Sequence, residues 1–453
     1  MDLKGKKVLV FGTGKSGVAA AQLLTKYEAE ILLLDGNVEL NVAELKEKLQ
    51  GVSYDRILLG ELPEAELKTL DLAVLSPGVP TDLPVVEAMK AAGICIWGEV
   101  ELAYQCGKGE VLAITGTNGK TTTTALLGEI MTSVRDDVKV VGNIGIPYTS
   151  LAAEMTEETV TVAEISSFQL ETIQDFCPKV SAVLNITPDH LNRHHTMENY
   201  IKAKLNITRN QGDAQTVVLN YEDEVLRQFG ENTKVPVVFF SSKRVLEKGL
   251  YLAGTDIIYA DGENTEVLIS VDELNILGAH NYENVMAASA MAICYGVALD
   301  SVRAVLRTFQ AVEHRIEYVT EKRGVRFYND SKGTNPDAAI KGIQAMNRPT
   351  FLIGGGYDKQ SEYGEWIDSF DGKVKKLVLI GQTREKIAKE AQAHGFHDYV
   401  FADTLEEAIT ICYENAVSGD AVLLSPACAS WGMFPDYEVR GKIFKEFVLG
   451  LKE

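Results

Sequence analysis

The chain has 453 residues, of which 64 are acidic and 44 are basic, and its formal net charge is -20 at pH 7. This length predicts about three domains, and the acidic balance excludes a surface suited to nucleic acid or to an anionic membrane. No apolar run approaches the roughly 18 residues of a membrane span, and the six cysteines are scattered without a CxxC pair. We therefore expect a soluble, cytoplasmic protein that binds neither nucleic acid nor membrane.

Short β-branched runs alternate with helical stretches along the chain, a pattern typical of parallel sheets with crossover helices. A polar insert at 243–273 is expected to form an antiparallel edge. We predict an α/β fold with three domains, at 1–98, 99–311 and 312–453. The expected strands lie at 6–12, 30–35, 72–78, 94–99, 111–116, 159–166, 180–186, 216–220, 235–240, 324–330, 350–356, 375–381 and 421–427, and the expected helices include 18–27 and 283–296.

The first strand is followed by the glycine motif "GTGKSG", with Gly12, Gly14 and Gly17 in the G-x-G-x-x-G spacing and Asp35 at the end of the next strand. Bare glycine backbone lets a diphosphate approach the N–H groups of a helix N-terminus. The context predicts a Rossmann-like N-terminal domain. A nicotinamide cofactor is one alternative at this motif, and a tight turn that binds nothing is another.

A second glycine loop, "TGTNGKT", precedes a helix in the next set of elements. It departs from the strict phosphate-loop pattern because Ile114 stands at the first glycine position. Lys120 can place a charge on the β and γ phosphates of a nucleotide, and Thr121 can offer its hydroxyl to Mg²⁺. The central domain is therefore predicted to be P-loop ATPase-like.

A carboxylate and an imidazole lie at or after the ends of two expected strands of this domain. Glu164 closes the run "TVTVAEIS", and His190 follows the run "VSAVLNI". Ligands gather at the carboxyl ends of parallel strands, so this carboxylate and this imidazole are candidates to ligate or orient Mg²⁺ beside Lys120. The neighbouring His194 and His195 are expected to be solvated.

The third set of elements predicts a Rossmann-like C-terminal domain. Asn281 and Asn284 stand at the start of an Ala-rich helix, where asparagine caps a helix or binds a base. Past the expected boundary come Arg315 and then a polar cluster after a strand, with Asp330, Lys332 and Thr334. From residue type alone, this cluster reads equally well as ordinary loop chemistry.

A resemblance resolves the choice. In this order and over nearly the full length, "TGTNGKTT", "EISSFQLE", "NITPDHLNRH", "HNYEN", "HRIE", "NDSKGTNP" and "SPACASWGMFPDYEVRG" resemble the Mur ligase family. The last segment, with "FGTGKSG" and "SPGV", is most similar to the members that add D-glutamate. The resemblance implies a monomeric ATP-dependent amide ligase of peptidoglycan synthesis, which joins D-glutamate to UDP-N-acetylmuramoyl-L-alanine through an acyl phosphate.

The resemblance also implies roles for individual residues. Catalytic groups would be Lys120, Glu164, His190, Lys204, Arg315 and Lys332, and Mg²⁺, as two ions, would be held by Thr121, Glu164, His190 and Lys204. Lys204 matches a position at which the family carries a carbamylated lysine. ATP would bind at Gly116, Thr117, Asn118, Gly119, Lys120, Thr121, Thr122, Asn281, Asn284, Arg315 and Asp330. The uridine substrate would bind at Gly14, Lys15, Ser16, Asp35, Gly36, Asn37, Gly78 and Asn143, and D-glutamate at Thr334, Lys359, Ser430, Trp431 and Tyr437.

The chain departs from the family pattern at three of these positions. Asn37, Trp431 and Tyr437 stand where well-known members carry arginine, leucine and phenylalanine. Three other functions remain open on the sequence: a family ligase that adds a different amino acid, an NAD-dependent oxidoreductase using Gly12 and Asp35, and a non-enzymatic P-loop switch.

Overall fold

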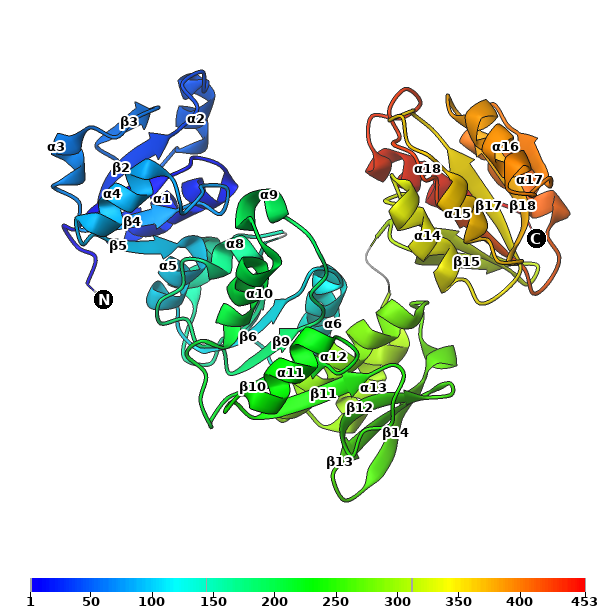
Figure 1. The fold of residues 1–453 in the computed structure, drawn as a ribbon, viewed down its shortest axis with the longest axis horizontal. Coiled ribbons are helices and arrows are strands. Elements are labelled where there is room, and N and C mark those ends of the chain that lie inside the picture. Colours follow the sequence, from blue (N-terminus) through cyan, green and yellow to red (C-terminus); the bar gives the residue numbers. More distant parts are fainter. Residues whose placement is uncertain (1, 144, 311–312, 453) are drawn as a thin grey trace. The chain divides into compact units, whose positions relative to one another are not determined.

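The structure, a computed structural model, describes residues 2–143, 145–310 and 313–452. The chain forms two compact units: Met1–Leu268 with Glu283–Val305, and Ile269–Tyr282 with Leu306–Glu453. Three sheets follow one another along the sequence, two in the first unit and one in the second (Figure 1). The α/β prediction is thereby confirmed. The expected boundary at residues 311 and 312 lies outside the described residues.

The first sheet is parallel and has the strand order β3-β2-β1-β4-β5. This order matches the first five strands of the Rossmann order 3-2-1-4-5-6, and it brings the loops after β2, β1 and β4 together at one edge. Its strands are β1 (Lys7–Phe11), β2 (Glu30–Asp35), β3 (Arg56–Leu59), β4 (Leu72–Leu75) and β5 (Cys95–Gly98), with helices α1 (Lys15–Lys26), α2 (Val42–Lys48), α3 (Glu64–Leu67), α4 (Pro84–Ala91) and α5 (Glu99–Cys106).

The central sheet has nine strands in the order β14-β13-β12-β11-β10-β9-β6-β8-β7. The expected antiparallel edge is confirmed, since β12 pairs antiparallel with β13. The strands are β6 (Glu110–Thr115), β7 (Val138–Gly142), β8 (Val160–Glu164), β9 (Val180–Val183), β10 (Thr216–Asn220), β11 (Val237–Ser241), β12 (Lys248–Ala253), β13 (Asp256–Asp261) and β14 (Thr265–Ser270).

The helices that accompany the central sheet come from both sides of the polar insert. They are α6 (Lys120–Thr132), α7 (Tyr148–Leu151), η1 (Ala152–Glu154), α8 (Ser167–Leu170), α9 (Leu191–His194), α10 (Met197–Leu205), η2 (Asn206–Thr208), α11 (Glu224–Asn232), η3 (Val271–Glu273), α12 (Ala279–Tyr295) and α13 (Leu299–Thr308). None of the helices in the described ranges has the length and apolar character needed to cross a membrane.

The third sheet has the order β15-β16-β20-β17-β18-β19 and is parallel except for the β15/β16 pair. Strands β16, β20 and β17 are therefore neighbours, and their following loops meet at one edge. The elements are β15 (Glu317–Lys322), β16 (Val325–Asn329), α14 (Pro336–Ala345), β17 (Thr350–Gly355), α15 (Gly364–Asp368), β18 (Val374–Ile380), α16 (Arg384–Ala393), β19 (Tyr399–Phe401), α17 (Leu405–Asn415), β20 (Ala421–Leu424) and α18 (Tyr437–Leu449).

The first two sheets share one apolar core. It runs from Val10 of β1 through Val100 of α5 and Tyr148 of α7 to Ala113 of β6, all of which are buried. In the second unit, alternate residues of β17 pack on opposite faces of the sheet, Leu352 into one core and Ile353 into the other. The loops of the first unit therefore rest on a continuous apolar support.

The turn from β1 into α1 depends on Gly17 more than on Gly14. A Cβ on Gly17 would lie 1.8 Å from the carbonyl oxygen of Gly12, whereas a Cβ on Gly14 meets no heavy atom within 4 Å. Gly14 has a φ of -71°, which any residue adopts.

We predict that Gly17→Ala lowers the free energy of unfolding of the first unit by roughly 1–3 kcal/mol, because the added methyl group forces the backbone apart. Gly14→Ala is the matched control and should change it by less than about 0.5 kcal/mol. Thermal and urea unfolding of both variants would measure this. Equal destabilisation by the two substitutions would show that the close approach at Gly17 does not matter.

Candidate functional site

Asp35, at the end of β2, holds the first glycine loop from the neighbouring strand. Its Oδ2 accepts hydrogen bonds from the backbone N–H of Thr13 (2.8 Å) and from Thr13 Oγ1 (2.6 Å), and its Oδ1 accepts from the N–H of Asn37 (3.0 Å). Burial by itself would raise the pKa of Asp35, but the bonds from Thr13 and Asn37 leave it lowered. Asp35 is therefore an ionised acceptor that shapes this loop.

A cavity of about 410 Å³ adjoins the same loop. Gly14 and Lys15 line it from the first sheet, and Pro147 and Ser150 line it from the central part of the unit. Lys15 Nζ also donates to the carbonyl oxygen of Gly145. Two segments far apart in sequence thus enclose space beside the N-terminus of α1, where an anionic group is favoured.

The other residues predicted for the uridine substrate, Asn143 apart, lie near the carboxyl ends of strands of the first sheet and do not line this cavity. Ser16 is in the first turn of α1, Gly36 and Asn37 follow β2, and Gly78 follows β4. Because β2 and β4 flank β1 in the sheet, these loops leave the same edge as residues 12–17.

The second glycine loop joins β6 to α6 and is tied to the loop after β9. Thr117 N–H donates to the carbonyl oxygen of Asn185 (2.9 Å), and Asn118 N–H donates to Asn185 Oδ1 (2.8 Å). Helix α6 has 13 residues, and no side chain caps its N-terminus. The first-turn N–H groups, which include those of Thr121 and Thr122, therefore suit an anion.

Gly119 permits the close packing of this loop. Its φ is +86°, and a Cβ there would lie 2.2 Å from Asn284 Oδ1. Asn284 is buried, in the first part of α12, and its Oδ1 also lies 3.4 Å from Thr123 Oγ1. The structure thus places Asn284 against the phosphate-loop motif.

Two lysines converge on one carbonyl oxygen of this loop. Lys120 Nζ donates to Gly116 O (2.8 Å) and to Thr117 O (3.0 Å), and Lys204 Nζ donates to the same Gly116 O (2.8 Å). Burial, reinforced by the charge of Lys120, lowers the pKa of Lys204 to about 7. Lys204 is therefore partly neutral near neutral pH, unlike an ordinary lysine.

Glu164 stands beside the loop on the adjacent strand. It is 2% exposed and pairs in register with Ile114 of β6, directly before the loop begins. Its Oε1 accepts a hydrogen bond from Asn143 Nδ2 (3.0 Å), and the backbone N–H of Asn143 donates to its carbonyl oxygen (2.8 Å). Asn143, predicted for the substrate, thus lies against the carboxylate predicted for the metal.

His190 lies on the loop after β9, and its side chain is half exposed. Its φ is +51°, a left-handed conformation that is unusual for a residue other than glycine. The ring is 3.4 Å from Asp189 Oδ2 and makes an edge contact with Phe168 at 5.0 Å between centroids. It follows the carboxyl end of β9, the strand on the other side of β6 from β8.

The expectation that His194 is solvated is wrong, whereas His195 is exposed as expected. His194 is 4% exposed, its Nε2 lies 3.0 Å from Ser167 Oγ, and it stacks on Phe168. Burial lowers the pKa of His194 although the carboxylate of Glu171 opposes this. The physical reason is that the short helix α9 packs this ring against Ser167 and Phe168, where the cost of burying the charged form outweighs the attraction of Glu171.

In the second unit, three loops follow the adjacent strands β16, β17 and β20, and they carry the residues predicted for the amino acid. Lys332 Nζ lies 5.5 Å from the ring centroid of Tyr437, and Lys359 Nζ lies 5.0 Å from that of Trp431. Each lysine therefore faces an aromatic ring, a cation–π arrangement. Thr334 follows Lys332 in the first loop, and Ser430, which is buried, precedes Trp431 in the third.

Arg315 is presented between two strained residues. His314 and Ile316 have φ values of +65° and +47°, and Arg315 itself is exposed. The N–H of His314 donates to Glu317 Oε2 (2.9 Å), and the N–H of Ile316 donates to Asp330 Oδ1 (3.3 Å). These bonds supply a physical reason why the motif "HRIE" holds an unfavourable backbone.

Glu313, His314 and Glu317 form the one cluster of possible metal ligands found among the described residues, with ligand atoms within 4.8 Å of one another. Lys445 Nζ already contacts the carboxylates of both Glu317 and Glu313, the latter at 3.0 Å. The cluster is therefore an ion-pair network, in which one ammonium bridges two carboxylates, next to the Arg315 loop.

Asp330 is 4% exposed and accepts a hydrogen bond from Ser425 Oγ (2.7 Å). Burial raises the pKa of Asp330 to about 7, against the opposing effect of Ser425 and nearby arginines.

Asn281 Nδ2 donates to the carbonyl oxygen of Leu277 (2.8 Å), so this side chain closes the first turn of α12.

Arg440, which the sequence analysis does not single out, joins two loops of the candidate site. It is 1% exposed, and its guanidinium donates to Ser331 Oγ (2.9 Å), Ser331 O (2.7 Å) and Cys428 O (3.2 Å). One buried cation thereby joins the loop of Lys332 to the loop of Ser430. The sequence signal for this role is weak: it consists only of the arginine at the end of "DYEVR", in the first turn of α18.

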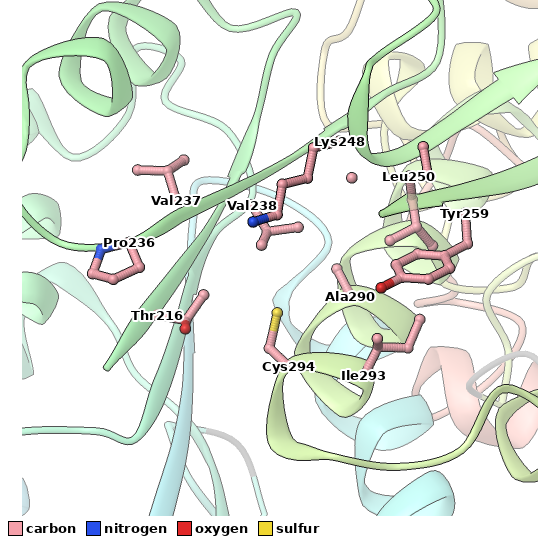
Figure 2. Close-up of a pocket in the computed structure, with 12 residues that line it drawn as sticks. Thr216, Pro236, Val237, Val238, Lys248, Leu250, Tyr259, Ala290, Ile293 and Cys294 are labelled. Atoms are coloured by element: carbon pink, nitrogen blue, oxygen red, sulfur yellow. The ribbon is translucent and has the colours of Figure 1, made fainter. Parts of the chain in front are cut away.

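A separate cavity of about 250 Å³ lies between strands β10–β13 and helix α12 (Figure 2). None of the predicted site residues lines it, and burial raises the pKa of its Cys294 thiol to about 11. This cavity is not part of the candidate site. Its walls are Thr216, Pro236, Val237, Val238, Lys248, Gly249, Leu250, Tyr259, Ala260, Ala290, Ile293 and Cys294.

Comparison with known families explains this set of loops. Family models for a Mur ligase MurD-like N-terminal domain, a Mur ligase middle domain and a Mur ligase glutamate ligase domain match residues 6–98, 114–292 and 314–428. The chain is 57% identical to UDP-N-acetylmuramoylalanine--D-glutamate ligase of Lachnoclostridium phytofermentans, over 100% of both chains. The chain belongs to the Mur ligase family. The family inferred from the sequence motifs is confirmed.

Other Mur ligases give the same answer. The enzyme of the same name from Lachnospira eligens is 55% identical over 100% of both chains. Among solved structures, MurF of Acinetobacter baumannii matches 97% of this chain and 93% of its own with a TM-score of 0.61 at 18% identity, and MurC of Thermotoga maritima matches 99% and 100% with 0.58 at 19%. These distant matches confirm the three-domain Mur ligase fold.

Because the carboxyl of Asp330 is buried, we predict that it makes the stability of the fold depend on pH. An acid whose pKa is raised by folding stabilises the fold fully below the pKa of the unfolded chain, 3.8, and loses this contribution as the pH rises through about 7. We expect the melting temperature of Asp330→Asn, relative to the natural protein, to increase between those pH values. Calorimetric scans across that range would measure the difference.

Ser425→Ala is the control, because it removes the hydrogen bond to Asp330 but keeps the titrating carboxyl. It should keep a pH-dependent stability, with the loss displaced to higher pH because Ser425 no longer lowers the pKa of Asp330. A melting-temperature difference for Asp330→Asn that stays constant across the range would contradict the raised pKa.

Proposed function

We propose that this Mur ligase joins the amine of D-glutamate to the L-alanine carboxylate of UDP-N-acetylmuramoyl-L-alanine at the expense of ATP. The observation that carries the proposal is the full-length 57% identity to a curated enzyme of that name. Two glycine loops in the first unit, each opening a helix, support it, because the reaction needs one cradle for the sugar nucleotide and one for ATP.

A carboxylate is a poor electrophile, so the amide bond requires activation. In the proposed reaction, a carboxylate oxygen attacks the γ-phosphorus of ATP, the bond to the bridging oxygen breaks, and ADP leaves. The amine nitrogen of D-glutamate then attacks the acyl phosphate and loses a proton, and the tetrahedral intermediate expels inorganic phosphate. The products are the amide, ADP and phosphate.

The residues around the second glycine loop suit ATP and Mg²⁺. Gly119 leaves room that a Cβ would fill, α6 offers an uncapped N-terminus, and Lys120 adds a cation at the loop. The groups that would hold two Mg²⁺ ions are the hydroxyl of Thr121, the carboxylate of Glu164, the imidazole of His190 and, once carbamylated, the side chain of Lys204. Mg²⁺ held there would supply positive charge against the phosphates.

The second unit carries the groups for the amino acid and for developing charge. Lys359 would face a carboxylate of D-glutamate, with Trp431 holding its ammonium from one side, and Thr334, Ser430 and Tyr437 would complete the pocket. Prearranged cations such as Lys332 stabilise transferring phosphoryl groups because they need no reorganisation. Arg315 would act with it, and Asn281, Asn284 and Asp330 would contact adenine and ribose.

The first glycine loop and its cavity would hold the uridine diphosphate end of the substrate through Gly14, Lys15, Ser16, Asp35, Gly36, Asn37 and Gly78, with Asn143 beside the reacting end. The relatives with which the chain was compared are named ligases, which weighs against the nicotinamide alternative. Because ATP and UDP-linked precursors are cytoplasmic metabolites, we place the reaction in the cytoplasm.

The environment of Lys204 supports a carbamate at this position. Two ammonium groups on one carbonyl oxygen repel each other, whereas a carbamate on Lys204 would attract Lys120 and offer oxygens to Mg²⁺. The neutral amine attacks the carbon of CO₂ and loses one proton as the N–C bond forms. A pKa of about 7 makes the neutral amine abundant at neutral pH.

The ligase proposal predicts that ADP and phosphate are released only when ATP, UDP-N-acetylmuramoyl-L-alanine and D-glutamate are all present. Coupled assays of ADP and phosphate, with a panel of candidate amino acids in place of D-glutamate, would measure this. Preference for another amino acid would favour a different Mur ligase activity. Phosphate release without the sugar nucleotide or without an amino acid would contradict the proposal.

Lys359→Ala tests the proposed amino-acid pocket in the same assay, with the KM for ATP as its internal control. Its KM for D-glutamate should rise by roughly 100-fold, the cost of about 3 kcal/mol for a lost charged hydrogen bond, while its KM for ATP stays close to that of the natural enzyme.

The carbamate proposal predicts that activity falls in CO₂-depleted buffer and returns with bicarbonate. The recovery should level off above about pH 7 and not continue toward 10.5, since the neutral amine is already the main form there. Carbon NMR with labelled bicarbonate should detect a carbamate in the natural enzyme and in Lys202→Arg, an exposed control on the same helix, but not in Lys204→Arg. Full activity without CO₂ and no carbamate signal would contradict it.

A further inference from the structure

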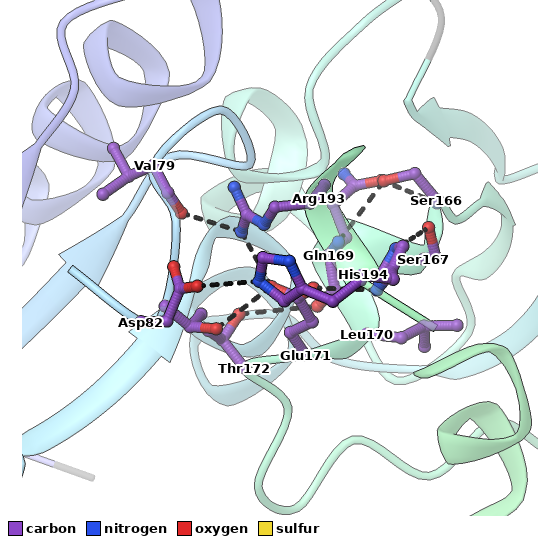
Figure 3. Close-up of polar contacts among 12 residues, drawn as sticks. Val79, Asp82, Ser166, Ser167, Gln169, Leu170, Glu171, Thr172, Arg193 and His194 are labelled. Atoms are coloured by element: carbon purple, nitrogen blue, oxygen red, sulfur yellow. Dashed lines mark hydrogen bonds and ion pairs between the residues drawn. The ribbon is translucent and has the colours of Figure 1, made fainter. Parts of the chain in front are cut away.

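Arg193 ties the loop after β4 to the loop that carries His190. Its Nη2 donates to the carbonyl oxygen of Val79 (3.0 Å) and to Glu171 Oε2 (2.7 Å), as Figure 3 shows. Val79 directly follows Gly78, and Arg193 lies three residues after His190. A residue predicted for the sugar nucleotide and a residue predicted for the metal are thus joined through one guanidinium.

Glu171 is the centre of this network, and both of its carboxylate oxygens are engaged. Oε2 accepts from Arg193 and from Thr81 Oγ1 (3.3 Å), and Oε1 lies 3.3 Å from His194 Nδ1 (Figure 3). The side chains of Arg193 and Glu171 are only 13% and 15% exposed. Water therefore competes weakly for these bonds, and their charges are little screened.

A second contact closes the same junction. His195 Nε2 lies 3.0 Å from Asp82 Oδ2. Residues 76–82 of the first sheet's edge are thereby held at two points by residues 193–195. Arg193 also lies over the ring of Phe168, at 5.1 Å from its centroid, and that ring in turn contacts His190.

The backbone of the His190 loop needs external support. His190 and His195, at the two ends of α9, both have positive φ values, +51° and +66°. Non-glycine residues hold such conformations only where their surroundings over-determine them. For this loop, several of the restraining groups belong to residues 79–82 and to Glu171, so the geometry of His190 depends on the sugar-nucleotide side.

We infer that Arg193 and Glu171 are positioning residues that couple occupancy of the sugar-nucleotide loop to the metal-nucleotide site through His190. The inference rests on the proposed function for the identity of the two ligands. A sugar nucleotide that orders residues 76–82 fixes Arg193, which in turn fixes the His190 loop. Because coupling is reciprocal, bound metal-nucleotide strengthens sugar-nucleotide binding by the same factor.

The first unit has a separate source of stability. Its two sheets share the apolar core that contains Val100 and Tyr148, so we expect variants of Arg193 to fold. Arg193→Met keeps an apolar stem against Phe168 but removes the donors, and Arg193→Lys keeps an ammonium that can reach both acceptors. Arg209→Met is the matched control, since Arg209 also donates to a main-chain carbonyl, that of Ile173 (3.2 Å), but away from residues 76–82.

The experiment measures coupling by calorimetry on the full-length protein. The affinity for Mg²⁺ with a non-hydrolysable ATP analogue is determined with and without UDP-N-acetylmuramoyl-L-alanine. We expect the sugar nucleotide to tighten it by a factor in the usual range of roughly 5–150. Arg193→Met should bring the factor close to one and raise the Mg²⁺ concentration needed for activity, whereas Arg193→Lys and Arg209→Met should keep most of it.

A wild-type coupling factor in Arg193→Met, or an equal loss in Arg209→Met, would overturn the inference. Hydrogen exchange of the unliganded protein tests the tie without any ligand, so it remains decisive if the ligase activity itself is refuted. Exchange should rise together in residues 76–82 and 190–195 of Arg193→Met. A rise confined to one of the two segments would also overturn the inference.

Discussion

The parallel neighbours β9, β6 and β8 are the constraint on which the candidate site depends. Parallel strands deliver their following loops to one edge, so the phosphate-loop motif, Glu164 and the His190 loop start side by side. The third sheet repeats the device with β16, β20 and β17, which bring Lys332, Ser430 and Lys359 to one edge. In both places, the chemistry is assembled by strand order and not by proximity in sequence.

Much of this could be predicted from the sequence because its signals are local. Buried β-branched runs identify the strands, and glycines between a strand and a helix identify both loops, since close approaches at Gly17 and Gly119 demand glycine. The positions of Glu164 at a strand end and of Lys332 shortly after one could be predicted because both lie within recognisable motifs. Their assigned roles stay predictions, as do the exact domain boundaries.

What could not be predicted depends on partners distant in sequence. Arg440 lies about a hundred residues from Ser331, and Arg193 meets Val79 and Glu171 from other elements. The solvated position predicted for His194 is wrong because Phe168 and Ser167, which bury its ring, come from another element. The pKa of Lys204 likewise follows from tertiary burial, which no pattern along α10 reveals.

In this acidic chain, the lysines of the candidate site contact backbone carbonyl oxygens or aromatic rings. The ammonium of Lys359 faces the indole of Trp431, and this contact has a practical consequence. Of the three tryptophans, Trp97 and Trp366 are buried, whereas Trp431 is 52% exposed. The native chain thus has an intrinsic fluorescent probe. A molecule that excludes water from the indole of Trp431, or displaces it, should shift the tryptophan fluorescence without an added dye or tag.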